Sequence, residues 1–169
     1  MILLVHMLFG VAVASLTKNP YLAILVAFLS HYFLDIFPHI EYPIDNLKNI
    51  KKLLLKSSAR GILLIKILPE FLYLVFDVFI GILLIFIFTD KNLLYFICAL
   101  FAIVPDSLTV LSAIMPNKPF GVTQGKILKI HDKFHREIIH FLRDKKISNF
   151  IRMSTQILAV IIAILILKK

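Results

Sequence analysis

The 169-residue chain has no tryptophan and only one cysteine, Cys98, and it shows no internal repeat, no low-complexity run and no glycine-rich phosphate loop. A lone cysteine cannot form an intrachain disulfide, and because Cys98 lies in an apolar segment we expect it to be a buried small hydrophobic residue. Charged residues are scarce as well, at 17% of the chain. The sequence therefore offers neither a disulfide framework nor a phosphate-binding loop.

What the chain has in abundance is apolar side chains, which make up 60% of its residues and give it a mean hydropathy of +0.92. Soluble domains are only about half apolar, so we expect an integral membrane protein of the all-α class, a polytopic helix bundle. The net charge of +9 could by itself suggest nucleic acid. In a membrane protein the placement of lysine and arginine matters more than their sum, and we expect no specific nucleic-acid binding.

Five stretches approach the roughly 20 apolar residues that a membrane-spanning helix needs. Turn residues at 18–20 and 90–92 separate the closely spaced stretches. We place Pro69 in the first turn of the third helix, where its missing N–H costs nothing, and we expect Glu70 to cap that helix. The five predicted spans cover residues 1–17, 20–38, 69–88, 91–115 and 150–167.

The first of these spans has a competing interpretation as a signal peptide. Ala12-Val13-Ala14 before Ser15 resembles a cleavage site, and residues 2–14 would be its apolar core. No lysine or arginine precedes the apolar run, however, and His6 interrupts it. We therefore expect a retained helix.

Two long connections, 39–68 and 116–149, carry most of the positive charge, with cytoplasmic amphipathic helices expected over 47–56 and from Lys126 onward. Fourteen lysine and arginine residues fall on the side of these connections, and four fall on the opposite side. Because positive charge stays in the cytoplasm, we expect an inner-membrane protein with its N-terminus inside and its C-terminus outside. The basic connections would then rest against anionic lipid headgroups.

Polar residues inside this apolar sequence gather at one depth of the predicted bundle. His6 lies about one turn into the first span, and His31 and Asp35 lie in the last two turns of the second. Asp106, which follows Pro105, lies in the inner half of the fourth span. Ionisable residues in a membrane segment are usually paired, cavity-facing or functional, so this common depth predicts a site.

The spacing of these residues suits a metal ion. His31 and Asp35 stand four residues apart and project from one helix face, and His131 and His135 repeat that spacing in the segment HDKFHREIIH. Imidazole nitrogen and carboxylate oxygen both bind Zn²⁺ and related divalent ions. We predict one site, or a two-metal site, with these ligands: His6, His31, Asp35, His39, Asp106, His131 and His135.

Within that site Asp106 or Asp35 would act as the catalytic base or as a ligand of the ion. His31 and Asp35 have an alternative role as an ion pair that fixes helix packing. His39 follows Pro38, which disfavours helix, so it is either a ligand or an interfacial residue.

Three further residues also have alternatives. His131 and His135 would belong to no site if their segment were only a membrane-surface helix, and His140 is expected on the surface of that helix. Asp77, deep in the third span, would either bond to another helix or join the site.

The pattern of His6, then His31-xxx-Asp35-xx-Pro38-His39, then a later histidine pair resembles the LexA-binding, inner-membrane-associated hydrolases and their small multi-pass relatives. That resemblance implies a metal-dependent hydrolase. Where those proteins carry an Asp-x-Asp-His cluster and an HRGxTH-like segment, this chain reads HDKFHREIIH. His31 and Asp35 are also similar to the zinc-binding signature of zinc-dependent phospholipase C and the single-strand nucleases, which implies a phosphate-ester substrate.

As an enzyme, the chain would hydrolyse a lipid or other phosphoester at the inner membrane surface, with metal-bound water as nucleophile. Two other function classes stay open. A metal or proton transporter would use the same groups, but it should carry polar residues through the whole membrane depth, and the outer half is nearly bare. A non-enzymatic scaffold would use the basic amphipathic connections to dock a lipid or a partner.

Overall fold

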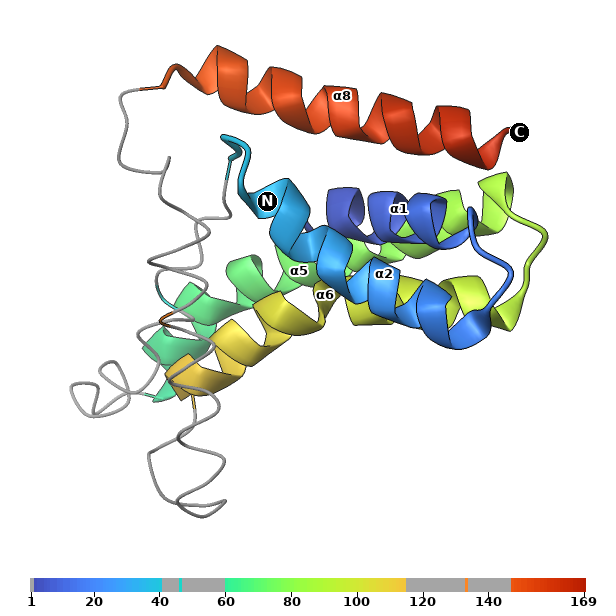
Figure 1. The fold of residues 1–169 in the computed structure, drawn as a ribbon. Helices are drawn as coiled ribbons and strands as arrows, with labels where there is room; N and C mark the ends of the chain where they lie inside the picture. Colours follow the sequence, from blue (N-terminus) through green and yellow to red (C-terminus); the bar gives the residue numbers. More distant parts are fainter. Residues whose placement is uncertain (1, 41–45, 47–59, 115–132, 134–146) are drawn as a thin grey trace.

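A computed structural model describes residues 2–40, 46, 60–114, 133 and 147–169 of the chain. Throughout these residues the regular structure is α-helical, which confirms the predicted all-α class. Five helices lie in the described residues (Figure 1): α1 (Leu3–Ala14), α2 (Pro20–Asp35), α5 (Arg60–Phe88), α6 (Leu93–Ile114) and α8 (Asn149–Leu167).

Local sequence explains where the helices begin and end. Asn19 caps α2, because its side-chain oxygen accepts hydrogen bonds from the backbone of Tyr21 at 3.0 Å and Leu22 at 3.1 Å. Proline follows at the first position of α2, as its fixed φ favours. The same helix ends at Asp35, since Pro38 disfavours helical backbone just before it.

Among the described residues, three helices contain a segment long and apolar enough to cross a membrane: Ile65–Phe88, Leu93–Val110 and Asn149–Leu167. The 12 residues of α1 and the 16 residues of α2 are apolar but shorter. At about 1.5 Å per residue they rise roughly 18 and 24 Å, less than the roughly 30 Å of hydrocarbon. The count of five spans therefore stays a prediction, while three span-capable helices are present.

The start of the third predicted span was wrong. The helix α5 begins at Arg60, so Pro69 lies inside it instead of in its first turn. A single proline removes only one backbone donor, and membrane helices tolerate that loss when neighbours satisfy the freed groups. Glu70 consequently does not cap the helix: its Oε1 accepts two hydrogen bonds from Asn46, from the backbone at 3.1 Å and from the side-chain amide at 2.8 Å.

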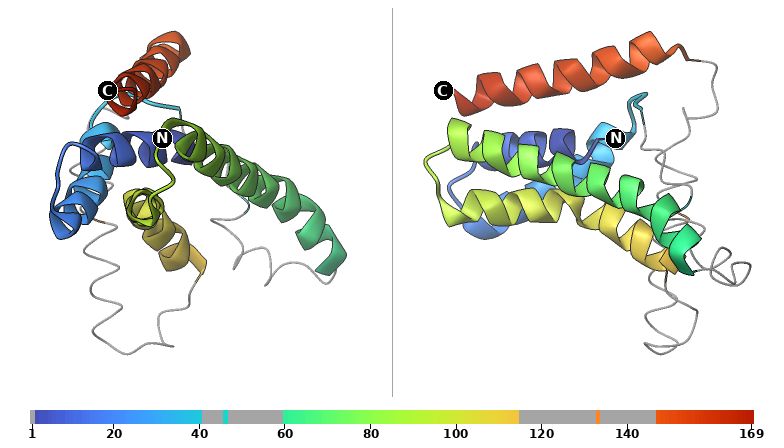
Figure 2. Two further views of the ribbon diagram at one scale, coloured as in Figure 1. Left: turned by 90° about the vertical axis from the view of Figure 1, so that its right-hand side faces the viewer. Right: turned by 180° about the vertical axis from the view of Figure 1, so that it is seen from behind.

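The helix α1 is the centre of the fold, because it packs against α2, α5, α6 and α8 (Figure 2). Its side chains are buried on all sides, and Met7, Leu8 and Val11 are completely covered. A helix that is apolar all round fits this surrounded position.

Two glycines let α1 approach its neighbours closely. A Cβ on Gly10 would lie 2.6 Å from Cβ of Ala102 on α6, and a Cβ on Gly81 of α5 would lie 2.9 Å from Sδ of Met7. The backbones of α1 and α6 are therefore nearer at Gly10 than any larger residue allows.

The helices alternate in direction, so their ends form two layers (Figure 1). One layer holds the turns after α1 and α5 together with the C-terminus, and the other holds the start of α1 and the ends of α2 and α6. Of the two amphipathic helices expected in the long connections, residues 47–56 lie outside the described part, and from 126 to 146 only Lys133 is described, as an exposed helical residue.

Candidate metal centre

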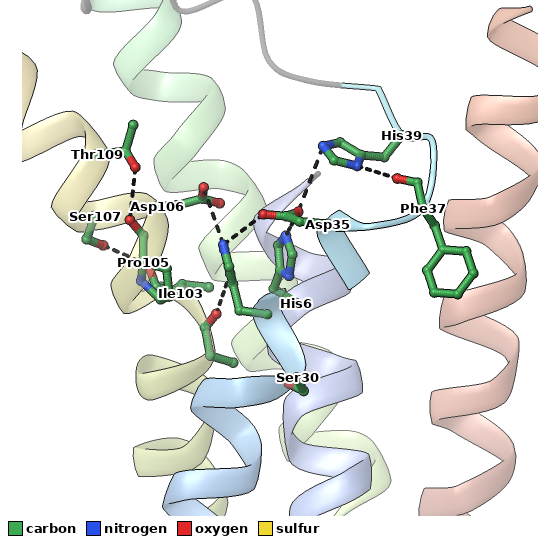
Figure 3. A network of polar contacts seen from close by, with 12 residues as sticks. His6, Ser30, Asp35, Phe37, His39, Ile103, Pro105, Asp106, Ser107 and Thr109 are labelled. Atoms are coloured by element: carbon green, nitrogen blue, oxygen red, sulfur yellow. Dashed lines mark hydrogen bonds and ion pairs between the residues drawn. The ribbon is translucent and has the colours of Figure 1, made fainter. Parts of the chain in front are cut away.

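Five predicted ligands lie together where α1, α2 and α6 pack against one another (Figure 3). The helix α1 supplies His6, α2 supplies His31 and Asp35, and α6 supplies Asp106. His39 follows on the chain segment just after α2. The predicted ligands His131 and His135 lie outside the described residues, as does His140, so their part in the site stays a prediction.

The carboxylate of Asp35 is the hub of the group. Its Oδ1 lies 3.3 Å from Nε2 of His6 and 3.8 Å from Nε2 of His39, while its Oδ2 lies 3.1 Å from Nε2 of His31. The second carboxylate, that of Asp106, approaches from α6, with Oδ1 3.7 Å from the same His31 nitrogen. Each of the three imidazoles thus faces a carboxylate oxygen with its Nε2.

Burial differs sharply between the two carboxylates. The side chains of His6 and His31 are completely buried, and that of Asp35 is 1% exposed. The side chain of Asp106 is 26% exposed, although the His31 ring that it approaches is covered. Asp35 is therefore enclosed by the group, whereas part of the Asp106 side chain is accessible from outside it.

The orientation of His31 is set by the backbone of α6. Its Nδ1 lies 2.8 Å from the carbonyl oxygen of Ala102, and a carbonyl only accepts, so Nδ1 is the donor. Ala102 lies in the turn before Pro105, where a proline loosens the helix backbone. With the hydrogen on Nδ1, the neutral ring directs the lone pair of Nε2 toward Asp35 and Asp106.

His39 is oriented in the same way by its own segment. Its Nδ1 donates to the carbonyl of Phe37 at 2.8 Å, which leaves Nε2 to face Asp35 (Figure 3). This is the arrangement of metal-binding histidines, whose second ring nitrogen is commonly held by a carbonyl or carboxylate. His39 therefore lies beside the group, and its role as a metal ligand stays a prediction.

His6 contributes a buried ring whose two nitrogens lack hydrogen bonds within the described residues. The ring stacks on that of His31, with centroids 4.0 Å apart and planes inclined by 22°. Its Nδ1 and Nε2 are both buried and make no hydrogen bond within the described part of the chain, although Nε2 lies 3.3 Å from Oδ1 of Asp35. Buried polar atoms of this kind normally bind an ordered water or an ion, or have a functional role.

The donor set fits a divalent cation. Neutral imidazole nitrogens and carboxylate oxygens both present lone pairs, which repel at these distances unless a proton or a cation lies between them. Neighbouring ligands of a tetrahedral zinc ion, with bonds of about 2.0–2.1 Å, lie roughly 3.3 Å apart. One donor atom each from His6, His31 and Asp106 lies within 4.8 Å of the others. This limit is wider than roughly 3.3 Å, so the three side chains would draw closer together around a bound zinc ion.

Comparison of the chain with protein-family models, with curated proteins and with solved structures finds no match. The resemblances noted in the sequence therefore remain expectations. The proposed function below rests on the geometry of these five side chains.

Asp77 lies outside the group, and the structure decides its role. Its Oδ2 accepts a hydrogen bond of 2.8 Å from the backbone N–H of Leu4, in the first turn of α1. The first N–H groups of a helix lack partners within the helix, so a carboxylate from α5 caps α1 from outside. Asp77 therefore bonds to another helix, one of the two roles that its sequence position suggested.

Sequence reasoning missed two residues of α8 that contact the segment bearing His39. The Thr155 hydroxyl donates to the carbonyl of Pro38, and the Gln156 side-chain amide donates to the carbonyl of Ile40 at 2.8 Å. The available signal was the polar run Ser154-Thr155-Gln156 inside an otherwise apolar span.

Proposed function

We propose that the chain is a membrane-embedded, metal-dependent hydrolase whose divalent ion, zinc in the first instance, is held by His6, His31 and Asp106 beside Asp35 and His39. The observation that carries the proposal is the convergence of their donor atoms, with those of His6, His31 and Asp106 within 4.8 Å of one another. Nitrogen and carboxylate ligands favour zinc over the harder cations, which prefer oxygen alone.

The reaction that suits this centre is the hydrolysis of a phosphoester. A divalent ion held by these residues would lower the pKa of water to about 7 and would so supply a nucleophile at neutral pH. The water oxygen bonds to phosphorus, the bond from phosphorus to the alcohol oxygen breaks, and the alcohol leaves with a proton. Asp106 is the group placed to move that proton, because its side chain is 26% exposed and so reaches the open side.

Asp35 has a different task in this scheme. Enclosed by three imidazoles and 1% exposed, it has no path to a substrate. It holds the rings of His6, His31 and His39 in place as a ligand or as their common partner.

The proposed location is the cytoplasmic membrane, with the N-terminus and both long connections inside and the C-terminus outside. The uneven distribution of lysine and arginine supports this orientation. It would put the centre near the cytoplasmic surface, where anionic lipid headgroups and phosphoester substrates are within reach.

The test is metal analysis of the protein purified in detergent and loaded with zinc. We expect one or two bound ions per chain, lost in His31→Ala and in Asp35→Ala. Cys98→Ala is the matched control. It removes a buried thiol of α6, a side chain of a type that can bind metal but that lies outside the cluster. An unloadable wild-type chain, or full zinc retention in the His31→Ala and Asp35→Ala double variant, would refute the metal centre.

A second measurement addresses the reaction. Zinc-loaded protein in nanodiscs is offered bis-p-nitrophenyl phosphate and, separately, vesicles of anionic phospholipid. We expect hydrolysis of at least one, and its loss in Asp106→Asn at zinc concentrations raised until the variant is saturated, because Asp106 is also a proposed ligand of the ion. Equal rates with Asp106→Asn would remove Asp106 from the proposed chemistry.

A further inference from the structure

Two polar side chains of α8 contact the segment that bears His39. The packing partner of this helix is α1, and Gln156, which is 4% exposed, and Thr155 lie in the first half of α8. An amide buried in a lipid-spanning helix is costly unless it is hydrogen-bonded. Such a residue therefore calls for an explanation beyond membrane insertion.

Both side chains bond to the backbone that follows α2. The Thr155 hydroxyl donates to the carbonyl of Pro38 and shares its single hydrogen with the carbonyl of Arg152 at 2.9 Å. Nε2 of Gln156 donates to the carbonyl of Ile40 at 2.8 Å. His39 is the residue between these two carbonyls. Non-helical backbone at membrane depth must have its polar groups satisfied by protein, and α8 provides that on both sides of His39.

These bonds leave the His39 ring in a defined position. Its Nδ1 is held by the carbonyl of Phe37 at 2.8 Å, and its Nε2 lies 3.8 Å from Oδ1 of Asp35. Four points thus fix a residue that is 7% exposed and belongs to no helix. A ligand on a loop contributes to metal binding only if its backbone is held, because ordering it during binding costs conformational entropy.

We propose that Thr155 and Gln156 are positioning residues of the metal centre: they clamp the Pro38–Ile40 backbone so that Nε2 of His39 is presented beside Asp35. The inference rests on the proposed metal site and adds α8 to it. The competing explanation is purely structural, in which the two bonds only dock α8. The two explanations differ in whether the effect of α8 passes through His39.

A double-mutant cycle in zinc affinity separates them. Thr155→Val and Gln156→Leu remove the donors at similar side-chain size, with Gln156→Met as a second variant of Gln156. Affinity is measured by competition with a fluorescent zinc chelator. Supporting groups around metal ligands are typically worth about 10–100-fold in affinity, so we expect each variant to bind about tenfold more weakly or worse.

Two variants, Thr155→Ser and a change of the neighbouring Ser154, serve as controls. Thr155→Ser keeps the hydroxyl and should keep near-wild-type affinity. Ser154→Ala removes the adjacent, exposed hydroxyl and should change nothing. In a His39→Ala background, Gln156→Leu should cause no further loss of affinity.

The contrary outcomes are distinct. An equal loss of affinity for Gln156→Leu with and without His39 would show that α8 acts on the fold alone. A zinc affinity that is unchanged in His39→Ala would overturn the clamp and leave the metal site standing. A wild-type chain that binds no zinc would instead overturn the proposed function and the clamp with it.

A readout without metal checks the same contact. In protein labelled with ¹⁵N-histidine, the His39 ring should show a fixed Nδ1–H tautomer, identified by its loss in His39→Ala. Gln156→Leu should convert that signal to an averaged one. A tautomer signal that survives Gln156→Leu and Thr155→Val together would refute the clamp.

Discussion

Replacing Gly10 by alanine tests whether the close crossing of α1 and α6 sets the geometry of the metal centre. The added Cβ would lie 2.6 Å from Cβ of Ala102, 3.4 Å from Oγ of Ser30 and 3.6 Å from the carbonyl oxygen of Ala27. Carbon atoms in contact are about 3.5–4.0 Å apart, so the first contact is short by roughly 1 Å. Neither alanine has a rotamer to change, so the two backbones must separate.

That separation acts directly on the proposed ligands. His6 lies one helical turn before Gly10, and Ala102 carries the carbonyl that holds His31. Metal–ligand distances tolerate only about 0.2 Å, so a shift of roughly 1 Å takes His6 out of range of the others. Overpacking of this kind costs about 1–3 kcal/mol, which corresponds to about 5–150-fold in zinc affinity if the strain is felt at the site.

The matched control is Gly81→Ala, on the other side of α1. Its Cβ would lie 2.9 Å from Sδ and 3.1 Å from Cε of Met7, the far end of a flexible side chain that can swing aside. Zinc competition and thermal unfolding in detergent are measured on both variants. We expect Gly10→Ala to weaken zinc binding by about 5–150-fold and Gly81→Ala to stay within about threefold. Equal zinc affinities for the two variants would refute the link between this crossing and the site.

Three further predictions concern stability, metal and orientation. Asp77→Leu should lower the free energy of unfolding by about 1 kcal/mol because α1 loses its cap, while Asp77→Asn, which keeps an acceptor, should lose less; equal losses would deny the role of that bond to Leu4. Zinc at about 100 times its Kd should raise the stability of the stripped protein by about 2.7 kcal/mol, seen as a higher Tm, and should do nothing for His31→Ala; an equal shift in that variant would place the stabilising ion elsewhere. In a Cys98→Ala background, an impermeant maleimide added to intact cells should label Lys91→Cys and spare Lys66→Cys, and the reverse pattern would invert the proposed orientation.

Much of the helix pattern could be predicted because it is written in local sequence. Apolar runs, the Asn19-Pro20 cap and the turn at 90–92 place the helix ends within a few residues. The start of α5 could not be predicted in this way, since a proline is equally compatible with a first turn and with a tolerated interior position. Which position applies depends on tertiary contacts, such as the hydrogen bond that Asn46 donates to Glu70.

The sequence could predict which of the described polar side chains lie near one another, but it could not predict their geometry. A shared depth and the four-residue spacing of His31 and Asp35 bring His6 and Asp106 to the same level. Nothing local to Thr155 or Gln156 identifies Pro38 and Ile40 as partners, because these contacts join segments more than a hundred residues apart. Likewise, the need for glycine at Gly10 depends on Ala102, a residue of another helix.

The pairing of the buried polar groups has a consequence for how the chain enters the membrane. During synthesis α1 and α2 emerge first, before α6 with Asp106 and α8 with its clamp. Asp35 already contacts both His6, at 3.3 Å, and His31, at 3.1 Å, within that first hairpin. Because an unpaired ionisable group is costly in lipid, a hairpin that carries its own partners can be inserted early and wait there for the rest.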